Sequence, residues 1–477
     1  MYRPDRLFPA DPRGREVARR IYGRVRDLPI ISPHGHVEAS FLAENKRLPN
    51  PAELLIYPDH YVTRLLHTLG ISMDLLSSSA STGADHARAS GEDHARASWA
   101  ALAEKWKFLR GTVVHYWLSV QLQVIFGIER ELSPQSATSI YDQIEAKLGE
   151  ENFLPRRLFE RFDISVLATT DSPIDDLAAH EQLAKLPNFW GQVLPTFRPD
   201  PFLEPGQREW PRYIEQLSQV AEVDCGSYGG WVAAMENRRE YFRKHGAKST
   251  DHSHLTADAT PLEGGEAQRI YTSALTGTAS REEANALRGH MLFEMARMSA
   301  DDGLTMTLHP GIERSHHQAT LQHYGPDTGH DIPVQLELTR ALKPMLNHFG
   351  TAARFKLVVF TVDETVYSRE LAPLAGFYPS VYIGAPWWFL DTNDAIQRWR
   401  SAITETAGFY KTSGFIDDTR AFVSIPVRHD MARRIDASFL ARLVTEERLT
   451  EPEAHEIAHD LVEAIPRNVF NLKTALT

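Results

Sequence analysis

The sequence has almost no cysteine, and it has no long apolar run. Cys225 is the single cysteine in 477 residues, so an internal disulfide is impossible, which fits a reducing compartment and a cytoplasmic location. The longest strong apolar run, residues 355–362 (FKLVVFTV), has the length of a β-strand and falls short of the ~20 residues that span a bilayer. The arginine-rich N-terminus carries Asp5, Asp11 and Glu16 and lacks an apolar stretch, so we expect no signal peptide.

An excess of basic residues is also missing. The chain has 51 Lys and Arg against 63 Asp and Glu, a net charge of −12, whereas proteins that bind nucleic acid non-specifically are usually basic. An acidic chain attracts no anionic ligand at long range, so a few local arginines must bind such a ligand. The composition is otherwise that of a folded protein, because 42% of the residues are hydrophobic and 24% are charged.

Short apolar runs alternate with longer helical patterns along most of the chain. This alternation is typical of a parallel sheet with right-handed crossovers, and about eight such units predict an α/β protein with a (β/α)8 TIM-type barrel. The candidate strands are Pro29–Ile31, Ile164–Ala168, Gln192–Pro195, Ala247–Thr250, Leu304–Leu308, Lys356–Thr361, Val381–Gly384 and Gly414–Ile416.

The first two candidate strands are separated by more than a hundred residues of mostly helical pattern. We therefore expect residues 1–36 and 164–477 to form the barrel, and residues 37–163 to form a helical insertion over its mouth. A six-residue duplication, DHARAS, occurs in this insertion at Asp85–Ser90 and again at Asp93–Ser98. Two copies are too few for a repeat architecture, so we interpret it as a local duplication at the surface.

Polar side chains follow almost every candidate strand, where barrel enzymes place their chemistry. His34 and His36 follow the first strand, and residues at i and i+2 of an extended segment point to the same side, so both imidazoles can bind one divalent ion. Asp418 follows the last strand, which is the neighbour of the first in a closed barrel, so its carboxylate can reach the same ion. The remaining strand ends carry Asp171, Arg198, Asp251, His309, Asp363, Trp388 and Arg420.

Each of these residues also has an ordinary structural interpretation. The histidine pair could lie in a surface loop, and Asp418 could cap a helix. Arg198 and Arg420 could grip a substrate carboxylate through a bidentate fork or pair with a nearby aspartate. The aromatic run Trp387–Phe389 packs in a core or forms a wall for a sugar-sized ligand. In the insertion, Asp59 and the residues after it are expected to begin a helix. Tyr61 in this helix can donate a proton to a ligand only if the insertion folds over the barrel mouth.

Eight segments of the sequence together resemble the uronate isomerase (glucuronate isomerase) family, a divergent branch of the amidohydrolase superfamily. The resemblance covers essentially the whole chain. It rests on IISPHGH at 30–36, PDHYVTR at 58–64, ATTDSPIDDL at 168–177, VLPTFRPD at 193–200, KSTDH at 248–252, LHPGIERSHH at 308–317, GAPWWFLDT at 384–392 and DDTRAFVSIPVRHDMARR at 417–434. It implies a distorted (β/α)8 barrel with a helical insertion after the first strand. It also implies the reversible conversion of D-glucuronate to D-fructuronate and of D-galacturonate to D-tagaturonate.

The resemblance further implies a set of site residues and a cofactor. One divalent ion, usually zinc, is held by His34, His36 and Asp418, and its role in catalysis is left open. Arg198 matches the residue that binds the substrate carboxylate, and His60 with Tyr61 matches a pair that contacts substrate. Positions that line the site or lie in its motifs are matched by Arg64, Asp251, His309, Trp388 and Arg420. The family is usually homo-oligomeric, and it implies neither a nucleic-acid nor a membrane partner. No lysine ends the fourth candidate strand, which disfavours a two-metal hydrolytic centre.

The hypothesis for the mechanism assigns Asp418 as the base that takes the proton from C2 of the open-chain sugar. Tyr61 or a water molecule at the ion completes the transfer to C1, Arg420 stabilises the enediolate, and Arg198 binds the C6 carboxylate. Two alternatives come from other classes. A metal-dependent hydrolase would use the same histidines and Asp418 to activate water, and a non-catalytic protein would only bind a sugar acid.

Overall fold

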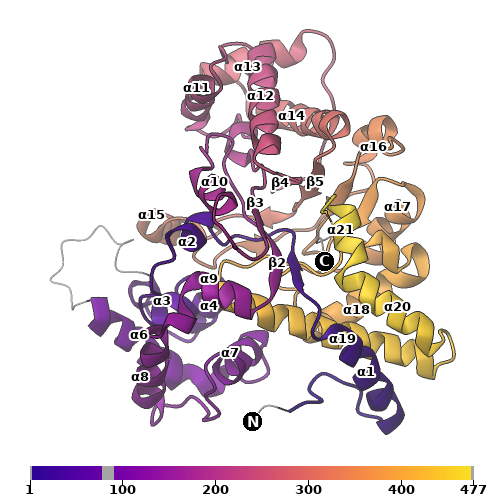
Figure 1. Ribbon diagram of the computed structural model, residues 1–477. Helices are drawn as coiled ribbons and strands as arrows, with labels where there is room; N and C mark the ends of the chain where they lie inside the picture. The colour runs from indigo at the N-terminus through magenta and orange to yellow at the C-terminus, as the bar shows by residue number, and fades with distance from the viewer. Residues whose placement is uncertain (1–2, 78–90, 474–477) are drawn as a thin grey trace.

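The computed structural model describes residues 3–77 and 91–473, which form a mixed α/β protein (Figure 1). The strands are β1 (Ile30–Ser32), β2 (Ile164–Ala168), β3 (Gln192–Leu194), β4 (Ser249–His252), β5 (Thr305–Leu308), β6 (Ile312–Glu313), β7 (Ile332–Pro333), β8 (Leu357–Val359) and β9 (Val381–Ile383). The helices of the first half are α1 (Pro12–Val25), α2 (Ala39–Glu44), α3 (Pro51–Leu55), α4 (His60–Thr68), α5 (Met73–Leu76), α6 (Gly91–Lys105), α7 (Val113–Val124), α8 (Ala137–Leu148), α9 (Pro155–Arg161), α10 (Ala178–Ala184), α11 (Trp210–Ala221) and α12 (Tyr228–Lys244). Those of the second half are α13 (Glu266–Leu275), α14 (Arg281–Asp302), α15 (Gln318–Tyr324), α16 (Lys343–Phe349), α17 (Ala372–Phe377), α18 (Asn393–Ala407), α19 (Ile425–Thr445), α20 (Glu451–Val462) and α21 (Ala464–Val469).

Seven of the strands form two parallel sheets at the centre. The first sheet has the order β1-β2-β3 and the second the order β4-β5-β8-β9, while β6 and β7 form a separate antiparallel pair. Phe197 connects the two parallel sheets, because it bridges Asp171 on one side and Thr250 on the other. The carboxyl ends of these strands therefore lie along one continuous edge, and the polar residues that follow each strand are brought together there.

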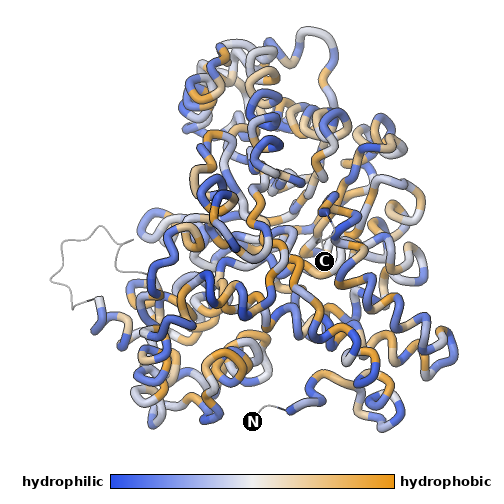
Figure 2. Tube along the Cα trace, viewed as in Figure 1, coloured by the Kyte–Doolittle hydropathy of each residue, from blue (hydrophilic) through white to orange (hydrophobic). Residues whose placement is uncertain are grey.

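The central strands are buried on both faces, as parallel sheets covered by helices are. Every residue of β2, β4, β5 and β8 is buried. The outer helices are amphipathic, so hydrophobic and hydrophilic residues alternate along them (Figure 2). In α1, for example, Asp11 caps the first turn and the buried residues Val17, Ile21 and Val25 share one face. That face packs against α19 and α20 near the C-terminus.

The described part of residues 37–163 consists of helices joined by turns and irregular segments, and it contains no strand. Helix α7 of this segment packs against α19, and α4 carries the predicted residues His60 and Tyr61. The first copy of the duplication, Asp85–Ser90, lies outside the described residues. The second copy, Asp93–Ser98, lies in α6, where Ala95 and Ser98 are buried.

The structure corrects several predicted elements. The strand expected at Ala247–Thr250 is β4, which lies two residues later at Ser249–His252. The prediction of a strand at Gly414–Ile416 was wrong. That segment is irregular, and in this region Thr412 bridges Ile383 of β9. The pair β6 and β7 was not expected, since two strands of two residues each carry no detectable alternation of hydrophobicity.

Candidate active site

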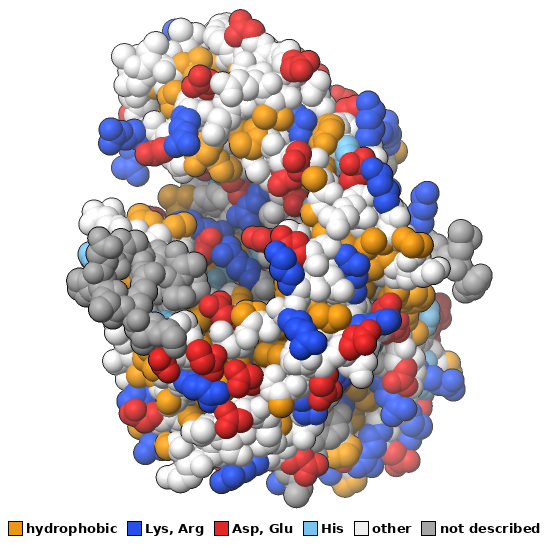
Figure 3. Space-filling view, turned by 60° about the vertical axis from the view of Figure 1, so that its left-hand side comes forward, with side chains coloured by type: hydrophobic (Ala, Val, Ile, Leu, Met, Phe, Trp, Pro, Cys, Tyr) orange, Lys and Arg blue, Asp and Glu red, His pale blue; other side chains and the backbone are white. Residues whose placement is uncertain are grey.

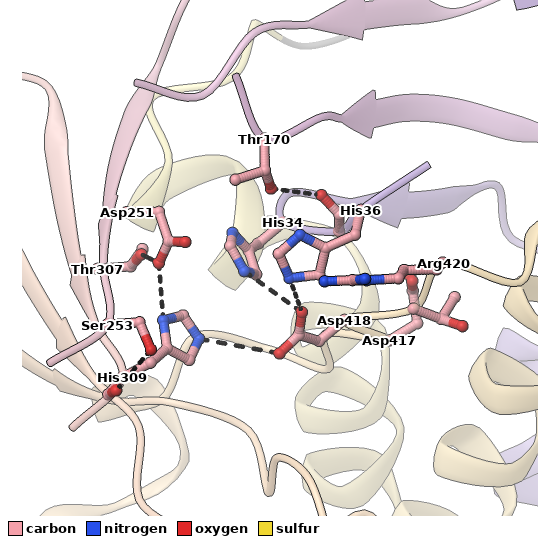
Figure 4. A network of polar contacts seen from close by, with 12 residues as sticks. His34, His36, Thr170, Asp251, Ser253, Thr307, His309, Asp417, Asp418 and Arg420 are labelled. Atoms are coloured by element: carbon pink, nitrogen blue, oxygen red, sulfur yellow. Dashed lines mark hydrogen bonds and ion pairs between the residues drawn. The ribbon is translucent and has the colours of Figure 1, made fainter. Parts of the chain in front are cut away.

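Three side chains from opposite ends of the chain converge beyond the end of β1 (Figure 4). The Nε2 atoms of His34 and His36 lie 3.4 and 3.0 Å from the same atom, Oδ1 of Asp418. The backbone N–H of His36 donates a hydrogen bond of 3.0 Å to the carbonyl oxygen of Thr419, which joins the two segments directly. The structure therefore brings together the three residues that the sequence analysis proposed as metal ligands.

The backbone at Asp418 has an unusual conformation. Its φ is 43°, in the left-handed region that aspartate tolerates better than most residues. Adjacent Asp417 serves a different partner, since its Oδ2 lies 2.9 Å from Nε2 of His429 in α19. The two neighbouring carboxylates thus contact different partners: Asp417 contacts His429, and Asp418 contacts His34 and His36.

These side chains fit a divalent metal ion. Within the described part of the chain, both carboxylate oxygens of Asp418 and Nε2 of His309 have no well-aligned hydrogen-bond partner, although they are buried. Burial raises the pKa of Asp418, but the charges of His34 and His36 outweigh burial and hold that pKa well below its usual range. The carboxylate is therefore ionised at neutral pH. One ionised carboxylate and two imidazoles within 4.8 Å of one another form a donor set suited to zinc and related ions.

A second row of charged groups lies beside the first. Nδ1 of His309 lies 2.8 Å from Oδ1 of Asp251, whose other oxygen lies 3.4 Å from Nη1 of Arg198. Burial raises the pKa of Asp251, but the charges of His34 and Arg198 and the hydrogen bond from His309 outweigh it and lower that pKa well below its ordinary value. Because the Asp251 carboxylate accepts from Nδ1–H of His309, Nε2 of His309 is left as the acceptor, 4.0 Å from Oδ2 of Asp418.

Helix α4 supplies two more of the predicted residues. The side chain of Asp59 caps the helix by accepting from the backbone N–H of Tyr61 at 2.9 Å. The hydroxyl of Tyr61 then donates a hydrogen bond of 2.8 Å to Asp391, whose other oxygen accepts from Arg428 at 2.7 Å. Burial and the charge of Asp391 raise the pKa of Tyr61 well above its usual value, so the hydroxyl keeps its proton at neutral pH. The imidazole of His60 stacks on Trp388, with ring centres 4.8 Å apart.

Arg420 and Arg314 face a carboxylate from the loop between β6 and β7. Nη2 of Arg420 lies 3.0 Å from Oδ2 of Asp327, and Nη1 of Arg314 lies 3.8 Å from Oδ1 of the same residue. Arg314 also lies over the ring of Trp388, at 5.1 Å from its centre. Burial and the charge of Arg420 lower the pKa of His60 to about 3, so this imidazole is neutral. This wall of the pocket is thus cationic at the arginines and neutral at His60.

One pocket collects most of the predicted residues. It is lined by His36, His60, Tyr61, Arg198, Trp388, Asp418 and Arg420, together with Arg314 and Arg428. An adjoining open pocket of about 570 Å³ shares His36, Arg198 and Arg420 with it. The space-filling view shows a hollow on one face of the molecule with basic and acidic side chains gathered in it (Figure 3). Arg64 does not line either pocket and instead lies over the ring of Phe389, at 4.9 Å from its centre.

Sequence reasoning assigned no role to four side chains that the structure places at the candidate site. Asp327 belongs to a loop for which no strand-end position was expected. Arg314, Asp391 and Arg428 lie inside the quoted motifs LHPGIERSHH, GAPWWFLDT and DDTRAFVSIPVRHDMARR, but the sequence pattern indicated no role for them. Tyr61, the partner of Asp391, is 330 residues away from it along the chain, so no local pattern indicates the contact.

Comparison with known proteins identifies the family. The sequence profile of the glucuronate isomerase family matches residues 13–470. The chain belongs to the glucuronate isomerase family. A uronate isomerase of Corynebacterium efficiens is 47% identical over 470 residues, and one of Cutibacterium acnes is 48% identical over 470 residues, with 98% of both chains covered in each case. The crystal structure of glucuronate isomerase from Caulobacter crescentus is 41% identical, has a TM-score of 0.95 and covers 99% of this chain and 98% of its own.

Membership of this family makes the chain an isomerase of carbohydrate metabolism that acts on a small sugar acid. It confirms the resemblance and does not favour the hydrolase alternative. Among residues 3–77 and 91–473, no helix combines the length and the apolar character that crossing a membrane requires.

Proposed function

We propose that this pocket interconverts D-glucuronate and D-fructuronate by moving a proton between C2 and C1 of the open-chain sugar. The observation that carries the proposal is the position of Asp418, an ionised carboxylate that shares one pocket with Arg198, Arg420 and Tyr61. An aldose–ketose isomerase needs a base at C2, a proton donor at the carbonyl oxygen and cations near the developing enediolate. D-Galacturonate, which differs from D-glucuronate at C4, is proposed as a second substrate.

Arg198 is proposed to bind the C6 carboxylate of the sugar. Burial lowers the pKa of its guanidinium, but the charges of Asp200 and Asp251 outweigh burial, so the net shift is upward and the group stays protonated. Its Nε donates to Asp200 at 2.9 Å, which fixes the plane of the guanidinium and leaves the opposite edge for a ligand. A neutral sugar offers no carboxylate to the edge of the guanidinium that faces away from Asp200, which favours a uronate.

Asp418 is proposed as the base, with Tyr61 and Arg420 completing the proton transfer. Tyr61 remains protonated and donates its single hydrogen to Asp391, so its hydroxyl must turn from Asp391 toward the sugar to protonate the carbonyl oxygen that becomes the hydroxyl of the ketose. Asp418 then returns the proton from C2 to C1, and the proton of the C2 hydroxyl passes back to Tyr61. Arg420 stabilises negative charge on the enediolate oxygens, because its guanidinium lines the same pocket as Asp418. His60 and Trp388 form one stacked wall against which the sugar packs, with Asp251 and His309 orienting the opposite side. Arg64 is also proposed to contact the substrate. Because its guanidinium lies over the ring of Phe389, this contact would require the loop at Phe389 to rearrange.

His34, His36 and Asp418 would hold one divalent ion, and zinc is the proposed one. Such an ion supplies a positive charge that orients the sugar hydroxyls and polarises a carbonyl oxygen.

The closure of the sheets into a barrel and the division of the chain into barrel and insertion are proposed as well. We propose a distorted (β/α)8 barrel made of residues 1–36 and 164–477, with residues 37–163 as a helical insertion over its mouth. Two contacts support this arrangement. Phe197 joins the two parallel sheets, and the bond from His36 to Thr419 joins the last irregular segment to the segment after β1. A cytoplasmic homo-oligomer is proposed from the family resemblance.

The deciding experiment is an NMR time course of the zinc-loaded protein with D-glucuronate in deuterated water. We expect the signals of a ketouronate to appear, and the amount of deuterium at C1 reports how far the transferred proton exchanges with solvent. Asp418→Asn should keep the fold and lose turnover. An absence of conversion of both D-glucuronate and D-galacturonate would refute the proposed reaction, and normal turnover of Asp418→Asn with metal bound would refute the role of the base.

A further inference from the structure

The segment that ends β4 repeats the spacing of the first histidine pair. His252, Ser253 and His254 again place two imidazoles at i and i+2, and both side chains are buried, with relative exposures of 0% and 3%. Asp200, from the short helical turn Asp200–Leu203, lies against them. Ligand atoms of these two histidines and Asp200 all lie within 4.8 Å of one another. This cluster is separate from His34, His36 and Asp418, and the proposed reaction gives its two histidines no role.

The hydrogen bonds of the two histidines determine which ring nitrogens are free. Nδ1 of His254 lies 2.7 Å from Oε1 of Glu204. Because a carboxylate only accepts, Nδ1 carries the hydrogen and Nε2 keeps its lone pair. Nε2 of His252 lies 3.1 Å from the hydroxyl of Thr250, which leaves Nδ1 as its second nitrogen. Among the described residues, neither Nδ1 of His252 nor Nε2 of His254 has a hydrogen-bond partner, although both atoms are buried.

When Nε2 of His252 donates to the hydroxyl of Thr250, which can accept as well as donate, two imidazole lone pairs and one carboxylate oxygen meet at this buried position. Nε2 of His254 lies 3.7 Å from Oδ1 of Asp200, too far for a hydrogen bond. In a tetrahedral site with bonds of ~2.1 Å, two ligand atoms lie about 3.4 Å apart, close to this separation. A histidine whose other nitrogen donates to a carboxylate, as His254 does to Glu204, is the usual arrangement around bound zinc.

We propose that Asp200, His252 and His254 bind a second divalent transition-metal ion of the zinc type. Two imidazole nitrogens and one carboxylate oxygen favour such an ion over magnesium or calcium, which take oxygen ligands. Three protein ligands leave a fourth position for water.

The second ion would position the arginines of the substrate pocket. Oδ2 of Asp200 accepts from Nε of Arg198 at 2.9 Å, and Oδ1 accepts from the backbone N–H of Ser253 at 3.0 Å. The hydroxyl of Ser253, which lies between the two histidines, accepts from Nη2 of Arg314 at 2.8 Å. An ion that fixes Asp200 to the segment after β4 therefore fixes both Arg198 and Arg314, which line the pocket.

The test measures bound zinc without substrate, so it does not depend on the proposed reaction. The full chain is stripped with a chelator, reloaded with Zn²⁺, passed through gel filtration and analysed by mass spectrometry of the metal. We expect two ions per chain in the wild type and in a control, His290→Asn, which changes a buried histidine outside both clusters. We expect one ion in His254→Asn. Equal zinc content in the wild type and His254→Asn would overturn the proposal.

A milder variant keeps the test decisive if His254→Asn fails to fold. Glu204→Gln retains an oxygen that accepts from Nδ1 of His254 but removes the charge, so affinity for one of the two ions should fall about 10- to 100-fold. A crystal of the wild type soaked in Zn²⁺ should show an anomalous peak among Asp200, His252 and His254. No peak there, at full occupancy of the first site, would overturn the proposal.

Steady-state kinetics test separately whether the second ion positions Arg198 and Arg314. In Glu204→Gln at limiting Zn²⁺, the KM for D-glucuronate should rise about tenfold while kcat changes little, because Arg198 and Arg314 bind substrate and do not transfer the proton. Excess Zn²⁺ should restore the KM. An unchanged KM after loss of the second ion would refute the positioning role.

Discussion

Replacing Asp171 with asparagine should stabilise the protein increasingly as the pH rises. Burial is the main reason that the pKa of this carboxyl is raised to about 7, and the charge of Asp175 adds to it, against hydrogen bonds from Thr169 and Thr196. The nearby imidazole of His180, 3.8 Å away, offers no compensating charge, because burial lowers its pKa to about 4. Asp171 is therefore a buried acid that the folded protein holds in its neutral form up to neutral pH.

The sign and size of the effect follow from linkage. In the unfolded chain the carboxyl ionises near its ordinary pKa of 3.8, whereas in the folded protein it ionises near 7. Below pH 4 both states are protonated and stability is unaffected. Between pH 4 and 7 the unfolded state alone loses its proton, so wild-type stability falls as the pH rises, by about 4 kcal/mol in total and by about 2.5 kcal/mol between pH 5 and pH 8. The side chain is only 12% exposed, so solvent screens this cost little.

The Asp171→Asn variant avoids that cost, because its amide oxygen accepts the same two hydrogen bonds and carries no charge. Its advantage over the wild type should grow by about 2.5 kcal/mol from pH 5 to pH 8. For cooperative unfolding of a chain of this length, whose unfolding entropy is about 1 kcal/mol/K, this is a change in the Tm difference of about 2–3 °C.

Differential scanning calorimetry of both proteins at pH 5 and pH 8 measures this difference. Asp176→Asn, which changes an exposed aspartate in the same loop, is the matched control. A Tm difference between Asp171→Asn and the wild type that stays constant with pH, or shrinks toward pH 8, would show that the folded protein stabilises the ionised carboxylate. The reasoning from burial would then be wrong.

Three further predictions concern the site. Tyr61→Phe should lower kcat about 10²- to 10⁴-fold with little change in KM in steady-state assays, and an unchanged kcat would remove the hydroxyl from the proton transfer. Arg198→Lys keeps the charge but loses the fork, so the KM for D-glucuronate should rise about 10- to 100-fold, whereas wild-type kinetics would contradict carboxylate binding at this position. A chelator should lower the Tm of the wild type, and Zn²⁺ at ~100 times its Kd should restore about 2.7 kcal/mol of stability per site. His36→Asn should lose one site's share of that recovery, and full recovery would contradict the first metal site.

Several of the parallel strands were predictable because they are short, largely apolar segments bounded by polar residues. β2 at Ile164–Ala168 was predicted with its observed bounds, because Phe162 and Asp163 precede it and two threonines follow it. β4 was displaced by two residues because its buried sequence, Ser-Thr-Asp-His, is entirely polar and satisfies itself through side-chain hydrogen bonds instead of apolar contacts. The segment Gly414–Ile416 has strand composition but does not form a ladder, because Gly414 has a φ of 75°.

The histidine pair and Asp418 were predicted to meet on the premise that Asp418 follows a last strand. That strand is absent, but the irregular segment still runs beside the sheet, because Thr412 bridges Ile383 and the backbone N–H of His36 donates to Thr419. The partners of Tyr61 could not be predicted, because α4 belongs to a helical segment whose placement no periodicity specifies. Asp327 was missed for a related reason. It sits at a φ of 61° in an irregular loop, and its ion pair with Arg420 depends on where the loop returns to the sheet.

The charges of the pocket explain how an acidic chain binds an acid. Arg198, Arg420 and Arg428 are paired with Asp200, Asp327 and Asp391, respectively. These carboxylates cancel much of the long-range field, which agrees with a net charge of −12, but they fix each guanidinium in one orientation. Selection of a uronate then rests on fixed short-range contacts and not on electrostatic steering. Steering needs an uncompensated charge whose electric field reaches beyond the Debye length of ~8 Å. Substrate binding should therefore depend only weakly on ionic strength, while loss of any one aspartate partner should disorder its arginine.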